Sequence, residues 1–348
     1  MSEFIWEKTS TITAADIPEL VENIELFSDY NQPIGPNVLP ESLESIVFGY
    51  HFNCPTGTCV LPKSLKHIKF GVYFNQPIEH NVLPDSLESI IFGIVFNQSI
   101  GAGVLPSSLK SIKFGVYFDR HIGPGVLPSS LISIDFGESF NQPIGPNVLP
   151  ESLRSIEFGS CFDRRIGPGV LPKSLISIEF GARFNHKIKV GTLPDSLESI
   201  VFGNSFNQRI GENVLPKSLK CVEFGEKYYD ISVTYQLDYI EHISILSARN
   251  AVEINVGLLP PSLKYLHLSN EDTLNSLNAE SQNMWFSIIY NRPHALLDIT
   301  YPVLCEPSSP CDSSYKVIGT ETIDGTEYNV LVNPEFYQPR SNAKSARK

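Results

Sequence analysis

The residues with the types and spacing to bind a metal ion are two histidines and two cysteines. His51, Cys54, Cys59 and His67 are all zinc-competent ligand types, spaced as H-x2-C-x4-C-x7-H. This spacing lacks the tight C-x2-C pair typical of structural zinc sites. The repeat described below also assigns the four side chains to different stations of two neighbouring units. We therefore expect no metal site and no cofactor.

Paired carboxylates are the other candidates for chemistry, because Asp135, Glu157 and Glu179 recur at intervals of 22 residues. Two carboxylates can act as general acid and general base when the environment of a pocket gives them different pKa values. An open sheet surface provides no such pocket. The chain also lacks a G-x-S-x-G nucleophile elbow and a G-x-x-x-x-G-K-S/T phosphate loop. The sequence predicts a protein that is not an enzyme.

The elements that must position these residues come from an internal repeat of 22 residues. Its template reads L-P-x-S-L-x-x-I-x-F-G-x-x-F-N-x-x-I-x-x-x-V. We number the positions of each coil from the Leu of the Leu-Pro pair. Coils 1 to 9 begin at Leu39, Leu61, Leu83, Leu105, Leu127, Leu149, Leu171, Leu193 and Leu215.

The residue types in the template predict a stack of short strands. Ile at position 8 and Phe at position 10 have the two-residue period of a strand with one buried face. Gly at position 11 lets the chain turn, and Pro at position 2 marks the corner before the strand. A 22-residue unit buries its apolar residues only against its neighbours. We expect a mainly β solenoid of about twelve coils, each with one short strand in a parallel stacked sheet, with terminal caps.

The repeat also explains the 21 phenylalanines, because 17 of them occupy positions 10 and 14. We expect these to form two stacked ladders in the core. The boundaries of the repeat predict four segments. They are an N-terminal cap (1–16), the solenoid (17–268), a C-terminal cap with a β-hairpin around Asp324-Gly325 (269–332), and a basic, disordered tail (333–348).

Position 15 holds a short side chain that both donates and accepts hydrogen bonds, or an aspartate. Such residues suit a hydrogen-bonded ladder along the turns, and Ser at position 4 suits a turn cap. We therefore predict a structural role for the position-15 residues: Asn31, Asn53, Asn75, Asn97, Asp119, Asn141, Asp163, Asn185 and Asn207.

The segments F-N-Q-P-I at Phe74–Ile78 and Phe140–Ile144, with L-P-x-S-L and I-x-F-G, resemble the FNIP repeat family. That family is related to leucine-rich repeats and occurs mainly in social amoebae and in giant DNA viruses that infect amoebae. The resemblance implies a leucine-rich-repeat-like solenoid without catalytic residues. Family members often carry an N-terminal F-box, which implies a link to a cullin-type ubiquitin ligase. The first 16 residues are too short for that module.

A surface for a partner is expected where the strand residues point away from the core. Position 9 is basic or apolar in the first coils and mostly acidic in the later ones, and position 13 adds aromatic residues. Exposed aromatics beside lysines are typical of protein-binding patches. An alternative is an ordinary solvated face with scattered apolar residues. The predicted partner-binding residues are Tyr73, Ile91, Val95, Lys113 and Tyr117.

These observations predict a non-enzymatic scaffold that binds a protein partner along its strand face. The alternative is a substrate adaptor of a cullin-type ligase without its own F-box. A structural or adhesive array of the position-7 serines fits less well. A nucleic-acid binder also fits less well, because the net charge is −12 despite basic residues such as Arg164 and Lys187. The dispersed cysteines and the absence of a signal-like segment favour an intracellular, cytoplasmic location, in the host cell if the protein is viral.

Overall fold

The computed structural model describes residues 3–228, 239–245, 262, 265–268, 303–305, 316–323 and 326–332. It divides into two compact units, Met1–Leu219 and Lys220–Lys348. Each unit is described by itself.

Unit 1 contains ten strands in one parallel sheet, in the order of the chain. From β2 onward each strand pairs with the strand one coil away, so that Ile46 lies opposite Ile68 and Ile68 opposite Ile90. A short 3-10 helix, η1 (Ala14–Asp16), lies between the first two strands. The strands are β1 (Glu3–Trp6), β2 (Asn23–Leu26), β3 (Ser45–Val47), β4 (His67–Lys69), β5 (Ser89–Ile91), β6 (Ser111–Lys113), β7 (Ser133–Asp135), β8 (Ser155–Glu157), β9 (Ser177–Glu179) and β10 (Ser199–Val201).

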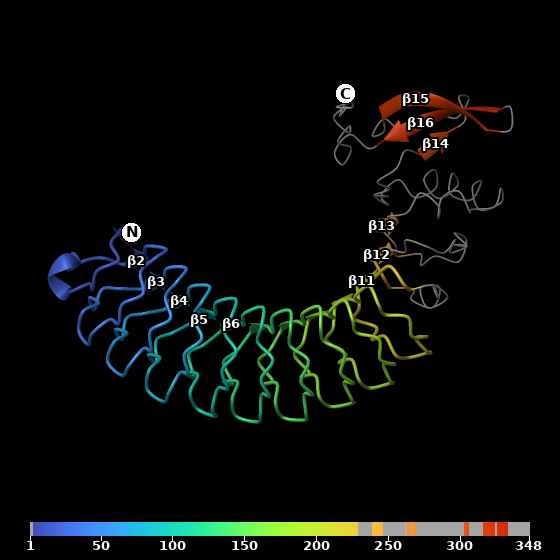
Figure 1. The fold of residues 1–348 in the computed structure, drawn as a ribbon. Helices are drawn as coiled ribbons and strands as arrows, with labels where there is room; N and C mark the ends of the chain where they lie inside the picture. The colour runs from blue at the N-terminus through green and yellow to red at the C-terminus, as the bar shows by residue number, and fades with distance from the viewer. Residues whose placement is uncertain are drawn as a thin grey trace. The chain divides into compact units, whose positions relative to one another are not determined.

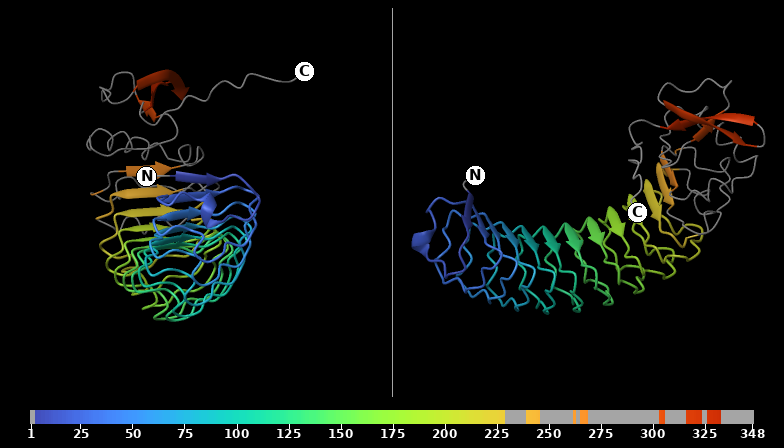
Figure 2. Two further views of the ribbon diagram at one scale, coloured as in Figure 1. Left: turned by 90° about the vertical axis from the view of Figure 1, so that its left-hand side faces the viewer. Right: turned by 45° about the horizontal axis from the view of Figure 1, so that its top comes forward.

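The core of unit 1 is built from the apolar positions of the repeat, as the sequence predicts. Ile112 at position 8 and Phe114 at position 10 are buried, whereas Lys113 between them is exposed. Position 14 contributes a second column of rings, and Phe118 packs on Phe114 at a centroid distance of 3.9 Å. The predicted parallel β-solenoid of about twelve 22-residue coils is therefore confirmed. The strands of unit 1 line the concave side of a curved stack (Figures 1 and 2).

Unit 2 begins with three strands that pair in parallel: β11 (Cys221–Phe224), β12 (His242–Ile245) and β13 (Tyr265–Leu268). A second, antiparallel sheet has the strand order β14-β16-β15. It consists of β14 (Val303–Cys305), β15 (Lys316–Ile323) and β16 (Thr326–Val332). Strands β15 and β16 flank Asp324-Gly325, and Ile323 lies opposite Thr326. The expected disordered tail, 333–348, lies outside the described residues.

Within the described ranges, no helix is a candidate for crossing a membrane.

Candidate functional site

Four of the five predicted partner-binding residues are exposed. Ile91 and Lys113 lie on strands β5 and β6, and Tyr73 and Tyr117 lie in the turns that follow strands β4 and β6. Tyr73 and Tyr117 are 45% and 56% exposed, Ile91 is 38% exposed, and Lys113 is exposed. Val95 is half-buried. It lies between the two tyrosines in the position-13 column, where a valine is too short to project past its neighbours. Four of these positions are therefore exposed in the structure, and Val95 is only partly accessible.

Two further exposed apolar residues, Tyr50 and Ile94, lie beside the predicted ones and were missed by the sequence reasoning. They occupy position 12, directly after the glycine at position 11 of the template, and are 47% and 42% exposed. The backbone N–H of Tyr73 donates to the carbonyl of Tyr50, and that of Tyr117 donates to the carbonyl of Ile94. Apolar residues at positions 12 and 13 in successive coils were the signal available in the sequence. We define the aromatic patch as Tyr50, Tyr73, Ile91, Ile94 and Tyr117.

The rings at one end of the aromatic patch contact one another. Tyr50 meets Tyr73 edge to face at a centroid distance of 5.3 Å. His51 stacks on Tyr73 with 8° between the ring planes and lies 3.5 Å from a carboxylate oxygen of Asp29. Edge-to-face and stacked pairs hold exposed rings in defined positions, which reduces the entropy lost when a partner binds.

The four zinc-competent residues do not come together. His51 packs on Tyr73, and Nδ1 of His67 lies 2.8 Å from the Ser89 hydroxyl. The Cys54 thiol donates to Oδ1 of Asn31 at 3.4 Å, while Cys59 is exposed on a separate turn. In the part of the chain that the structure describes, no group of three or more such ligands has the geometry to hold a metal ion.

Lys113 is engaged within the protein, which changes its expected role. Its Nζ lies 2.5 Å from Oδ2 of Asp135, the residue opposite it on strand β7. This hydrogen bond raises the pKa of Lys113, against the opposing effect of desolvation. Lys113 is therefore a charge-compensated residue that marks the border between the aromatic patch and the acidic coils.

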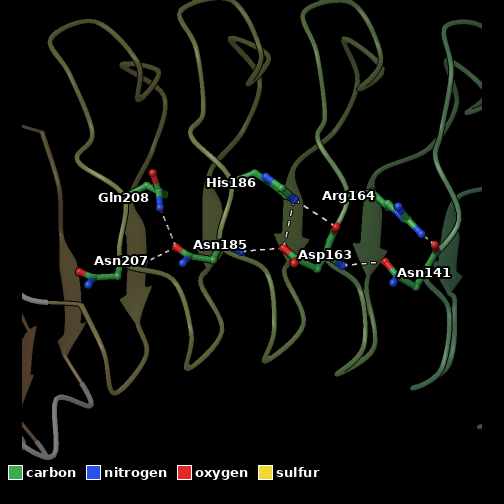
Figure 3. A network of polar contacts seen from close by, with 7 residues as sticks. All are labelled: Asn141, Asp163, Arg164, Asn185, His186, Asn207 and Gln208. Carbon is green, nitrogen blue, oxygen red and sulfur yellow. Dashed lines mark hydrogen bonds and ion pairs between the residues drawn. The ribbon is translucent and has the colours of Figure 1, made fainter.

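The position-15 residues form a continuous ladder along the solenoid. In each case the backbone N–H donates to the side-chain Oδ1 of the residue one coil earlier, at 2.9 to 3.2 Å, from Asn53 onto Asn31 through to Asn207 onto Asn185. Figure 3 shows the last links of this series. This hydrogen bond needs only an accepting oxygen on the side chain, so Asp163 can make it as well as an asparagine can.

The position-16 side chains also reach back by one coil. Nε of Arg164 donates to the Asn141 carbonyl at 2.8 Å, and Nε2 of His186 lies 3.2 Å from Oδ1 of Asp163 (Figure 3). Gln208 donates to Oδ1 of Asn185 at 3.0 Å. Arg164 and His186 thus cross-link neighbouring coils, which weakens the case for a nucleic-acid-binding surface at these residues.

The position-4 serines differ from the turn caps predicted from the sequence. Each donates its hydroxyl to the carbonyl of the position-5 residue one coil earlier, as Ser64 does to Leu43 at 2.6 Å and Ser86 to Leu65 at 2.7 Å. They join neighbouring coils rather than closing their own turn.

One strand per coil, a stacked apolar core and side-chain ladders define a leucine-rich-repeat-like solenoid. The FNIP repeat model matches residues 10–51, 52–94, 96–139, 140–182 and 184–227. The chain belongs to the FNIP repeat family.

A solved structure with the same architecture is the crystal structure of CroV588, described as a novel circular LRR protein structure. It shares 41% sequence identity with this chain and superimposes with a TM-score of 0.70. The match covers 74% of this chain and 38% of that one, so this chain spans well under half of the length of CroV588. A comparison with the curated proteins found no match.

Proposed function

We propose that the protein is a non-enzymatic interaction scaffold that binds a protein partner along the strand side of unit 1. The observation that carries the proposal is the aromatic patch. It gathers five exposed apolar side chains from four adjacent coils. Tyrosine and isoleucine side chains that lie together on a rigid backbone are typical of the centre of a binding surface. A leucine-rich-repeat-like solenoid supports this use, because its stacked strands offer a long, regular concave surface.

The proposal is tested by comparing the partners of the wild-type chain with those of a Tyr73→Ala, Tyr117→Ala double variant. Proximity labelling in the native cell, read out by mass spectrometry, identifies the partners. We expect specific proteins to be lost from the double variant. They should be retained by Val190→Ala, which removes an exposed apolar side chain from the opposite turn of coil 7. Identical partner sets for all three chains would show that the patch is not the binding surface.

The same experiment separates the scaffold from the ligase adaptor. A cullin, or the linker protein that receives F-boxes, is expected among the labelled proteins of an adaptor. Their absence from a set that still responds to the tyrosine substitutions supports the plain scaffold.

A further inference from the structure

The later coils of unit 1 carry a column of carboxylates on the strand surface. In the strand register Asp135 lies opposite Glu157, and Glu157 lies opposite Glu179. Neighbouring strands are roughly 4.8 Å apart, and like charges directly opposite each other are destabilising. Asp135 is compensated by Lys113. Glu157 is exposed between two acidic neighbours, and exposed Glu138 at position 12 adds a further carboxylate.

The charged residues at position 6 are arranged differently from those at position 9. In coils 1 to 4 the residues at this position alternate in sign, and Lys66 contacts Glu44 at 2.6 Å while Lys110 contacts Glu88 at 2.8 Å. These hydrogen bonds raise the pKa of Lys66 and lower the pKa of Glu88. Adjacent coils can therefore pair opposite charges across the stack. The architecture therefore does not require residues of the same sign at position 9. The exposed carboxylates of Glu157 and Glu138 place negative charge on the surface.

The acidic column continues directly from the aromatic patch. The patch occupies coils 1 to 4, where exposed Lys69 is also found, and the carboxylates of position 9 occupy coils 5 to 7. The Lys113–Asp135 pair lies at the junction. Within coils 1 to 7 the strand side thus has an apolar, weakly positive part and a negative part. Such a division favours one orientation of a bound segment over the reverse.

We infer that the partner is a polypeptide segment with apolar side chains toward one end and Lys or Arg toward the other. This inference rests on the proposed function, since it names the chemistry of the partner at the same surface. The apolar end packs on the aromatic patch, and the cationic end lies on Glu138 and Glu157. Lys69 disfavours the reverse orientation. A membrane surface or a nucleic acid would present phosphates to these carboxylates and be repelled.

The spacing of the two halves sets the length of the segment. From Tyr73 in coil 2 to Glu157 in coil 6 there are four steps between coils, which span roughly 19 Å at the usual strand spacing. An extended chain covers that distance in about six residues. The apolar and cationic residues of the partner should therefore be separated by about that many positions.

The test uses a phage-displayed library of random 16-residue peptides, selected on the full chain. We expect the selected peptides to combine aromatic or aliphatic residues with Lys or Arg, in one order and about six positions apart. A representative peptide is then synthesised, and its affinity is measured by fluorescence anisotropy. A Glu138→Lys, Glu157→Lys variant should bind it at least tenfold more weakly. The control is Glu79→Lys, Glu212→Lys, which has the same net charge change on exposed far turns and should bind like the wild type.

The outcomes distinguish this inference from the proposed function. If the charge reversal binds within twofold of the wild type while Tyr73→Ala, Tyr117→Ala loses binding, the inference is wrong and the scaffold proposal stands. If selected peptides carry no excess of Lys or Arg, the inference is also wrong. If no peptide is enriched, or if neither variant weakens binding, both fail.

Discussion

The ring of Phe74 lies parallel to the ring of Phe96, with 6.1 Å between centroids and 4° between planes. The same 6.1 Å spacing recurs between Phe140 and Phe162 farther along the stack. Strands in a parallel sheet are only roughly 4.8 Å apart. The distance between neighbouring coils is therefore larger at the position-14 rings than at the strands. This difference tilts each coil relative to the one before it, so that the strands lie on the inside of the curve (Figure 1). This curvature makes the strand side concave, so that one bound segment can contact several coils.

The close approach of the coils on the strand side requires glycine at position 11. A Cβ added to Gly115 would lie 1.9 Å from the carbonyl oxygen of Gly93. Since backbone cannot move aside cheaply, we expect Gly115→Ala to destabilise the protein by more than about 3 kcal/mol. The urea midpoint of the far-ultraviolet circular dichroism signal measures this.

Gly123 in the same coil provides the matched control. No heavy atom lies within 4 Å of the Cβ that would be added there. Gly123→Ala should leave stability unchanged or raise it by about 0.4–1 kcal/mol, because alanine restricts the unfolded chain. Equal effects of the two substitutions would mean that the glycine column does not set the distance between coils.

The ladder at position 15 should depend on a side-chain oxygen and not on an amide. Oδ1 of Asn75 accepts from the backbone N–H of Asn97 at 2.9 Å and from Nε2 of Gln98 at 3.1 Å. Asn75→Asp keeps this oxygen and should change the free energy of unfolding by less than about 0.5 kcal/mol. Asn75→Leu has a similar size and leaves the Asn97 N–H without its acceptor, so we expect a loss of about 1–3 kcal/mol. Urea denaturation of both variants measures these changes. A similar loss of unfolding free energy in both would show that the amide group of Asn75 is needed as well as its oxygen.

The fold was predictable because periodicity reports which side chains share a column. Ile112 and Phe114 are two residues apart and recur every 22, which places them on the buried face of stacked strands. Periodicity does not report which atoms of neighbouring coils meet. The Ser64 hydroxyl bonds to the Leu43 carbonyl, 21 residues earlier, whereas the Asn53 N–H bonds to the Asn31 side chain, 22 residues earlier. That difference depends on the path of the turns, so the serines were misinterpreted as turn caps.

The surface was predictable only in part, for a similar reason. The exposure of Tyr73 and Tyr117 could be predicted because position 13 lies just after the strand and points outward. Their role in binding stays a prediction. Tyr50 and Ile94 were missed because only positions 9 and 13 were considered as surface positions. In the structure these two residues lie in the turn after the strand, where the backbone is hydrogen-bonded from coil to coil. The contact of Lys113 with Asp135 depends on side-chain rotamers, which no spacing in the sequence reveals.

Thr192 occupies position 22, where most coils carry valine, and replacing it with valine should stabilise the protein. It is 3% exposed, and Oγ1 has no hydrogen-bond partner. Among coils 1 to 8, the seven other coils all carry valine at position 22, for example Val170 and Val214. Thr192→Val removes a buried hydroxyl without a change in shape, so we expect a gain of about 1–2 kcal/mol in urea denaturation. Thr192→Ala, which also loses a methyl group, should not show this gain. A loss with Thr192→Val would indicate that the hydroxyl is satisfied.

Cys59 is held in a backbone conformation that suits asparagine or glycine. Its φ is 64°, and the equivalent residues of the adjacent coils are Asn37 and Asn81, with φ of 57° and 62°. The left-handed region costs most L-residues about 1–2 kcal/mol and asparagine less. Cys59→Asn should therefore raise the free energy of unfolding by about 0.5–1 kcal/mol. Cys59→Ala remains strained and should stay close to the wild type. Destabilisation by Cys59→Asn would show that the thiol makes a contribution of its own.

The Cys54 thiol should react slowly with alkylating reagents at neutral pH. Burial raises its pKa, so a smaller fraction is thiolate at any given pH, and the thiolate is the reactive form. We expect the rate of iodoacetamide labelling, measured by mass spectrometry in the Cys59→Asn background, to reach its midpoint at a higher pH in the folded protein than in urea. A zinc site that used this thiol would act in the opposite direction, because a bound metal favours the thiolate and so lowers the pKa. A folded midpoint at or below the unfolded one would contradict the effect of burial on this pKa. In the wild-type chain, protection of Cys54 that appears only on addition of zinc would support a metal site of His51, Cys54, Cys59 and His67.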